Sequence, residues 1–225
     1  MKYSITGGNL PVVTLQLEAG EKVMCEAGAM SWMDRGIEME TKGGGLGKMF
    51  GRMFTGESLM MNHYEAKQAG EIAFASSFPG EIRAVEVTPS NPIVVQKRAF
   101  LASAGNIQMS VFFQKKLGSG IFGGEGFLMQ KLEGQGLVFL EIDGSAHDFE
   151  LAPGQEKVVN TGYVAMMDAS VKMDVEMIKG VKNVVFGGEG LFNTVLTGPG
   201  KVTIQSMPIP NLAGIISGYI PTTGK

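Results

Sequence analysis

Short runs in which apolar and polar residues alternate make up most of the chain, and glycines separate one run from the next. The clearest run covers residues 171–177, where valine and methionine alternate with lysine, aspartate and glutamate. Residues 107–111 repeat the pattern. An alternation with period two is typical of a β-strand that has one face on a core and one in water. The pattern therefore predicts an all-β protein with many tight turns.

Several of these runs recur at a fixed spacing. The motif Phe122-Gly-Gly-Glu-Gly126 returns 64 positions later as Phe186-Gly-Gly-Glu-Gly190, and residues 87–90 and 98–103 resemble residues 151–154 and 162–167 at the same spacing. An earlier copy, offset by 68 to 70 positions, includes residues 28–33 and 54–58. We therefore predict three repeats, at about 1–80, 81–145 and 146–207, within one structural unit covering residues 1–225. Each repeat is expected to form a small β-sandwich module, with the modules closing on one another.

A segment inserted in the first copy has helical rather than strand spacing. Its apolar residues share one helical face and its basic residues lie on the polar side. The apolar residues are Leu46, Met49, Phe50, Met53 and Phe54, and the basic ones are Lys48 and Arg52. The spacing predicts a short helix near 46–54. This helix would either lie on an anionic membrane surface or a partner protein, or cover the open end of a β module.

The end of the chain has a second helical pattern. Leu212, Ile215, Ile216 and Tyr219 fall on one face, Asn211 is suited to the N-cap, and Pro221 would stop the helix. We predict a short C-terminal helix at about 210–220. Its apolar face is expected to pack on the protein's own body or on a neighbouring subunit.

Composition places the chain among ordinary globular proteins. Hydrophobic residues make up 44% of its 225 residues and charged residues 18%. A formal net charge of −3 argues against a main task of neutralising phosphates. The single cysteine, Cys25, excludes an internal disulfide framework and favours a reducing compartment. Because no signal peptide and no apolar run of roughly 20 residues is evident, we expect a cytoplasmic protein, with attachment to a membrane surface as an open alternative.

Three features taken together resemble a known family over about residues 1–220. They are the glycine-rich run with Thr55-Gly-Glu-Ser58 at 43–58, the two Phe-Gly-Gly-Glu-Gly turns and the apolar C-terminal helix. The chain resembles the altered-inheritance-of-mitochondria family, which is classed structurally with the tryptophan RNA-binding attenuation protein (TRAP). The resemblance implies a TRAP-like, double-stranded β-helix-like fold with internal duplication and homo-oligomers. For eukaryotic relatives it implies a role in organising the mitochondrial inner membrane, and it carries over no catalytic residue.

Nucleotide-binding motifs are present only in fragments. Residues 118–123 match the dinucleotide fingerprint in letters, but residues 127–132 have the pattern of a strand where that motif requires a helix. Lys48 follows Gly47 without the serine or threonine of a P-loop. We interpret both segments as turns and predict no cofactor.

Candidate metal and catalytic residues are isolated along the chain. Glu57, Glu125 and Glu189 hold equivalent places in the repeats. Capping of glycine turns is the favoured interpretation, and convergence on a cation around a pseudo-threefold axis is the alternative. The remaining candidates lack a second ligand, a base or a nucleophile elbow in sequence. They are His63, His147, Cys25, Ser103, Ser110 and Ser145.

These observations favour a non-enzymatic, homo-oligomeric scaffold or interaction protein. The candidate contact residues are those of the inserted segment at 46–54, facing a membrane surface or a protein partner. A small-ligand site between repeats or subunits is the alternative function. RNA binding ranks last, because the lysines at 115, 116, 179 and 182 are not interleaved with aromatic residues on one strand.

Overall fold

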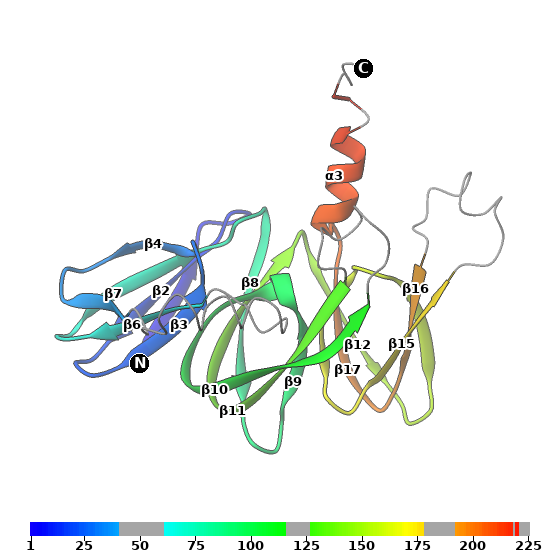
Figure 1. Ribbon diagram of the computed structural model, residues 1–225, viewed down its shortest axis with the longest axis horizontal. Coiled ribbons are helices and arrows are strands. Elements are labelled where there is room, and N and C mark those ends of the chain that lie inside the picture. Colours follow the sequence, from blue (N-terminus) through cyan, green and yellow to red (C-terminus); the bar gives the residue numbers. More distant parts are fainter. Residues whose placement is uncertain (41–60, 116–126, 178–191, 218, 221–225) are drawn as a thin grey trace, which may run out of the picture.

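The computed structural model describes residues 1–40, 61–115, 127–177, 192–217 and 219–220 (Figure 1). Within them the regular structure is almost wholly antiparallel β-sheet. A single turn of 3-10 helix (Lys97–Ala99) and one α-helix, α3 (Ile209–Ser217), complete it. The predictions of an all-β fold and of a short C-terminal helix are confirmed.

The N-terminal module comprises the described residues up to Ala75. Its strands are β1 (Lys2–Thr6), β2 (Val12–Leu17), β3 (Lys22–Glu26), β4 (Met30–Met33), β5 (Ile37–Glu40), β6 (Met61–Ala66) and β7 (Gly70–Ala75). One sheet has the order β1-β2-β7-β4, and β3, β6 and β5 lie in a second sheet. In β2, Val13, Leu15 and Leu17 are buried while Gln16 is exposed, so the period of two in the sequence sets the buried face.

The middle module is built around one long hairpin. Its strands are β8 (Gly80–Val87), β9 (Ile93–Gln96), β10 (Phe100–Lys115) and β11 (Phe127–Asp143). β10 and β11 pair along almost their whole length, and β11 also pairs with β8 and β9.

The C-terminal module is again made of short strands. They are β12 (Ala146–Leu151), β13 (Glu156–Asn160), β14 (Val164–Asp168), β15 (Lys172–Met177), β16 (Phe192–Thr197) and β17 (Gly200–Gln205). β15 is the strand predicted from residues 171–177, and its Met173 and Val175 are buried in the module's core.

One pairing scheme recurs in the three modules. β7 pairs with β2 and β4, and β17 pairs in the same way with β12 and β14. β6 pairs with β3 and β5, and β16 pairs with β13 and β15. In the middle module the two halves of β11 take these two roles. The scheme is the one that three repeats would produce, although the repeats themselves stay a prediction from the sequence.

The modules lie in a row (Figure 1). A ten-stranded sheet runs through all three, because β10 pairs with β3 and β14 pairs with β9. The expectation that the modules close on one another is therefore wrong: among the described residues, the first and third modules share no sheet pairing. Each junction uses one strand from each of two neighbouring modules, so a row of three modules has two junctions and two free ends.

Helix α3 begins at Ile209, within one residue of the predicted start, but its cap is not the predicted one. Asn211 was expected to be the N-cap, but it lies within the first turn, and its side-chain amide donates to the Tyr163 hydroxyl at 2.8 Å. The Ile209 N–H instead donates to the Asp143 carboxylate at 3.2 Å. A carboxylate from the distant strand β11 therefore takes the part of a cap, at the end of the helix where negative charge is favourable.

Candidate interaction surface at two open sheet edges

The predicted contact segment lies outside the described residues. This applies to Leu46, Lys48, Met49, Phe50, Arg52, Met53 and Phe54, and also to Glu57, Glu125 and Glu189. The helix near 46–54 and the arrangement of the three glutamates stay predictions.

Of the isolated candidates for catalysis, Cys25, His63 and Ser103 lie on three neighbouring strands, where His63 and Ser103 are each opposite Met24, the residue before Cys25. His63 is on β6 and His147 is on β12, so the two histidines belong to different modules. Cys25 is fully buried in β3, where burial raises the pKa of its thiol to about 12. Among the described residues no three histidine, cysteine, aspartate or glutamate side chains are grouped so that they could hold a metal ion.

Two buried carboxylates at the end of β11 are used by the fold. Glu141 accepts hydrogen bonds from the Ser76 hydroxyl at 3.0 Å and from the Ser77 N–H at 2.7 Å. Asp143 holds the start of α3, and burial is the main cause that raises its pKa to about 6. Both carboxylates join segments that are far apart in the sequence, which is a structural role.

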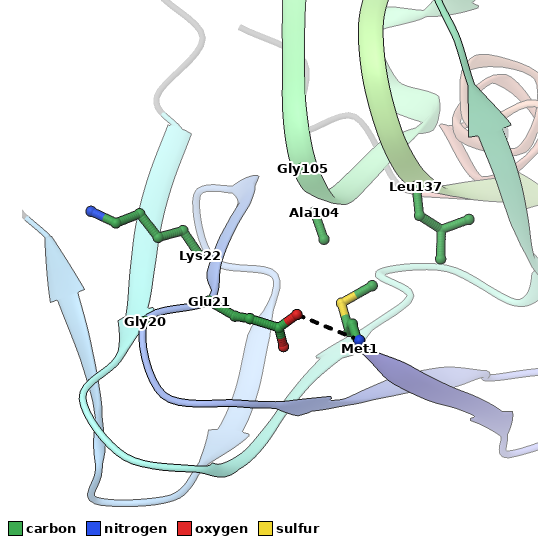
Figure 2. Close-up of a pocket in the computed structure, with 7 residues that line it drawn as sticks. All are labelled: Met1, Gly20, Glu21, Lys22, Ala104, Gly105 and Leu137. Atoms are coloured by element: carbon green, nitrogen blue, oxygen red, sulfur yellow. Dashed lines mark ion pairs between the residues drawn. The ribbon is translucent and has the colours of Figure 1, made fainter.

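A pocket of about 380 Å³ lies where the N-terminal and middle modules meet (Figure 2). Met1, the turn at Gly20 and Glu21, and Ala104 line it. The Glu21 carboxylate already pairs with the Met1 amino group at 3.4 Å and accepts the Glu18 N–H at 2.9 Å. The Lys22 side chain points away from the ion pair of Met1 and Glu21 (Figure 2). The polar groups around this pocket are therefore engaged within the chain rather than available to orient a ligand.

Strand β4 forms an open edge at one end of the row (Figure 1). Within the described residues it pairs with β7 alone. Met30 is half-buried against the core, while Trp32 is 48% exposed and Met33 is 37% exposed. The Trp32 indole N–H donates to the Glu71 carboxylate at 2.9 Å, which fixes the ring beside the free edge.

Strand β13 forms a second open edge in the last module. In the part of the chain that the structure describes, β13 pairs only with β16. Val158 is 59% exposed, and Lys157 stands over the Phe149 ring at 4.8 Å from its centroid. A strand edge with free N–H and C=O groups and exposed apolar side chains is a template for pairing with another chain.

The apolar side of helix α3 is also exposed. On the helix Ile215 and Ile216 face solvent, as do Tyr219 and Ile220 beyond its end, and the helix projects from the body of the molecule (Figure 1). Within the single chain, Leu212 is half-buried whereas Ile215 and Ile216 do not pack on the protein's own body. Packing of this face on a neighbouring subunit stays a prediction. No described helix has the length and apolar character needed to span a bilayer.

The sequence did not reveal the two open edges. Residues 28–33 align with residues 98–103, so the equivalence of β4 with the start of β10 was visible. Alignment of repeats, however, says nothing about which strand pairs with a neighbouring module. That information comes only from the register of the folded sheet.

Three comparisons relate the chain to known proteins. A family model described as Mitochondrial biogenesis AIM24 matches residues 3–207. The uncharacterized protein M6_Spy0233 of Streptococcus pyogenes serotype M6 (strain ATCC BAA-946 / MGAS10394) is 30% identical over 235 residues, covering 100% of this chain and 93% of the relative. The crystal structure of protein SPYM3_0169 from Streptococcus pyogenes matches with a TM-score of 0.82 at 26% identity, covering 97% of this chain and 99% of that one.

Proposed function

This chain belongs to the family described as Mitochondrial biogenesis AIM24, as its sequence motifs indicated, and from that premise we propose that it is a non-enzymatic, homo-oligomeric interaction protein. The observation that carries the proposal is the pair of open edges, β4 and β13, at the two ends of a row of joined modules. Unpaired N–H and C=O groups along an edge strand favour pairing with another chain, unless charged residues, proline or another segment protect the edge. Trp32, Met33 and Val158 are apolar and exposed on these edges, next to the charged Glu156 and Lys157 of β13.

The polar clusters support a role without catalysis. Glu141 and Asp143 are occupied by backbone and serine donors, and Asp148 accepts two hydrogen bonds from Arg83, both at 2.7 Å. The Arg83 guanidinium holds the pKa of Asp148 below its usual range. A catalytic site needs titratable groups that face a space where substrate can bind, whereas these three carboxylates face hydrogen-bond donors of the fold itself.

Native mass tests the proposal. Size-exclusion chromatography with light scattering at micromolar chain concentration is expected to give the mass of two or more chains of 23.9 kDa. A mass equal to one chain across the accessible concentration range would refute the homo-oligomer.

Attachment to a membrane surface is a second candidate, and the exposed apolar side of α3 favours it. Amphipathic helices bind the interface by burying such a face among lipid headgroups. Co-sedimentation with phosphatidylcholine–phosphatidylserine vesicles measures this attachment. The Ile215→Asp/Ile216→Asp variant should lose pelleting if α3 makes the contact, whereas loss in Phe50→Asp/Phe54→Asp would assign it to the inserted segment. Wild-type protein that stays in the supernatant would exclude the membrane candidate.

A further inference from the structure

The two junctions between modules have the same strand register. At the first, Ala102 of β10 lies opposite Cys25 of β3, and Ala104 lies opposite Val23. At the second, Met166 of β14 lies opposite Val95 of β9, and Asp168 lies opposite Ile93. Positions on the β10 and β14 side differ by 64, and those on the β3 and β9 side differ by 70, which are the two offsets of the sequence repeat.

The strands that meet at a junction fill fixed roles in their modules. One role is filled by β4, by the start of β10 and by β14, which each pair with the last strand of their module. Each of these pairings has a register shift at the equivalent position. The shifts lie between Met30 and Trp32, between Phe100 and Ala102, and between Val164 and Met166. β3, β9 and β13 each pair with the strand that fills the place of β6. The two junctions pair β10 with β3 and β14 with β9, so β4 and β13 are the two strands of these roles that have no partner in a neighbouring module among the described residues.

Side chains at the formed junctions are more buried than the side chains at equivalent positions on the open edges β4 and β13. Ala102 and Val95 are fully buried at the formed junctions. The residues in the same places on the open edges are Trp32 and Val159, which are exposed and half-buried. The next pair along shows the same contrast, since Ser103 and Val94 are buried whereas Met33 and Val158 are exposed. The open edges therefore present apolar side chains at places that the formed junctions bury fully, as at Ala102 and Val94, or by half, as at Met24 and Met166.

We propose that β4 of one chain pairs antiparallel with β13 of a second copy of this chain, in the register that places Trp32 opposite Val159, Met33 opposite Val158 and Asp34 opposite Lys157. The inference rests on the proposed homo-oligomer and names the surfaces that join its subunits. The register follows from the formed junctions by applying the repeat offsets to both strands.

The charges in this register are complementary. Asp34 is negative and Lys157 is positive, and side chains directly opposite on an antiparallel pair lie close enough to interact. Asp34 is held in place because its carboxylate accepts the Glu71 N–H at 2.8 Å. Its counterpart Asp168 accepts the Lys201 N–H at the same distance in the formed junction with β9. The open edge thus has the local geometry of a junction strand before any partner binds.

The junction joins different surfaces of the two chains. Each chain offers one β4 and one β13, at opposite ends of the row (Figure 1). A contact of this heterologous kind leaves one edge of each kind free after two chains associate, so further copies add until the ends meet.

Disulfide trapping tests the junction on the full chain. Directly opposite residues on antiparallel strands have Cα atoms about 4.5–5.5 Å apart, which suits a disulfide. The test variant is Met33→Cys/Val158→Cys, and the off-register control is Met33→Cys/Val159→Cys, whose thiols would lie on opposite faces of the pair. Native Cys25 can stay, because its thiol is buried and scarcely ionised at neutral pH.

Oxidation of Met33→Cys/Val158→Cys is expected to give a ladder of covalent multiples on a non-reducing gel, which collapses on reduction. The off-register variant and each single variant should remain at one chain. An oligomeric native mass without this ladder would overturn the junction while leaving the proposed homo-oligomer intact. A covalent dimer of Met33→Cys alone would show β4 pairing with β4 and would likewise overturn it. A monomeric native mass would overturn both proposals.

Discussion

The Val158→Lys substitution tests the energetic role of the β13 edge. Val158 is 59% exposed in the single chain, and its counterpart Val94 is fully buried at a formed junction. Full burial of a valine side chain contributes about 1.5–3 kcal/mol, so burying the exposed part on assembly contributes about 1–2 kcal/mol. Losing that contribution weakens each junction roughly 5- to 30-fold. The fold of the chain should be unaffected, because the residue is exposed before assembly.

Mass photometry over a dilution series measures this effect as the concentration at which the oligomer dissociates. The matched control is Val111→Lys, which changes a valine of similar exposure, 47%, on β10, away from the proposed junction. The dissociation midpoint should rise in Val158→Lys and stay at the wild-type value in Val111→Lys. Equal midpoints for wild type and Val158→Lys, or an equal rise in both variants, would refute the reasoning.

Three further predictions concern single side chains. Trp32 is the only tryptophan, so its emission should move to shorter wavelength as concentration rises through the assembly range, because the ring loses water at the junction; emission that stays constant while the mass grows would contradict this. Lys157→Glu places like charges opposite each other and should weaken assembly, most strongly at low salt, while Lys172→Glu should not; sedimentation at two ionic strengths measures the difference. Asp143 binds its proton more tightly in the folded state, because burial raises its pKa from 3.8 to about 6. Its stabilising contribution is therefore present below about pH 4 and is lost as the pH rises through about 6. The free energy of unfolding in urea, measured between these pH values, should fall in wild type and change less in Asp143→Asn, and identical profiles would contradict the assignment.

The strands could be predicted where one face is buried and the other is wet. Residues 171–177 show this for β15, because Met173 and Val175 enter the core of the last module while the charged residues between them face water. The alternation is a local property, and burial on one face of a sheet is sufficient to produce it. The family resemblance was also carried by local motifs.

The arrangement of the modules could not be predicted in the same way. The offset of 64 residues relates Ala102 to Met166, but it does not state that these residues lie opposite Cys25 and Val95. Pairing between modules depends on backbone groups that every residue carries, so side-chain patterns specify it weakly. For the same reason the open edges at β4 and β13 have no distinct sequence signature.

The capping group of α3 could not be predicted for a related reason. Asn211 is a good N-cap by residue type, but the group that accepts the Ile209 N–H is the Asp143 carboxylate, 66 positions earlier. A cap supplied by tertiary structure has no local signal. The Ile209 N–H lowers the pKa of Asp143, but the burial of the carboxyl beneath the helix outweighs this effect and raises the pKa to about 6.

Amide hydrogen exchange compared above and below the assembly concentration tests the central claim most directly. The claim is that β4 and β13 are free in the single chain and pair with each other in the oligomer. Peptides covering residues 30–33 and 156–160 should gain protection together. Strand β12, which among the described residues pairs with β17 alone and has no part in the proposed junction, should exchange equally in both states. Protection of only one of the two edges, or of neither while the mass increases, would contradict the account.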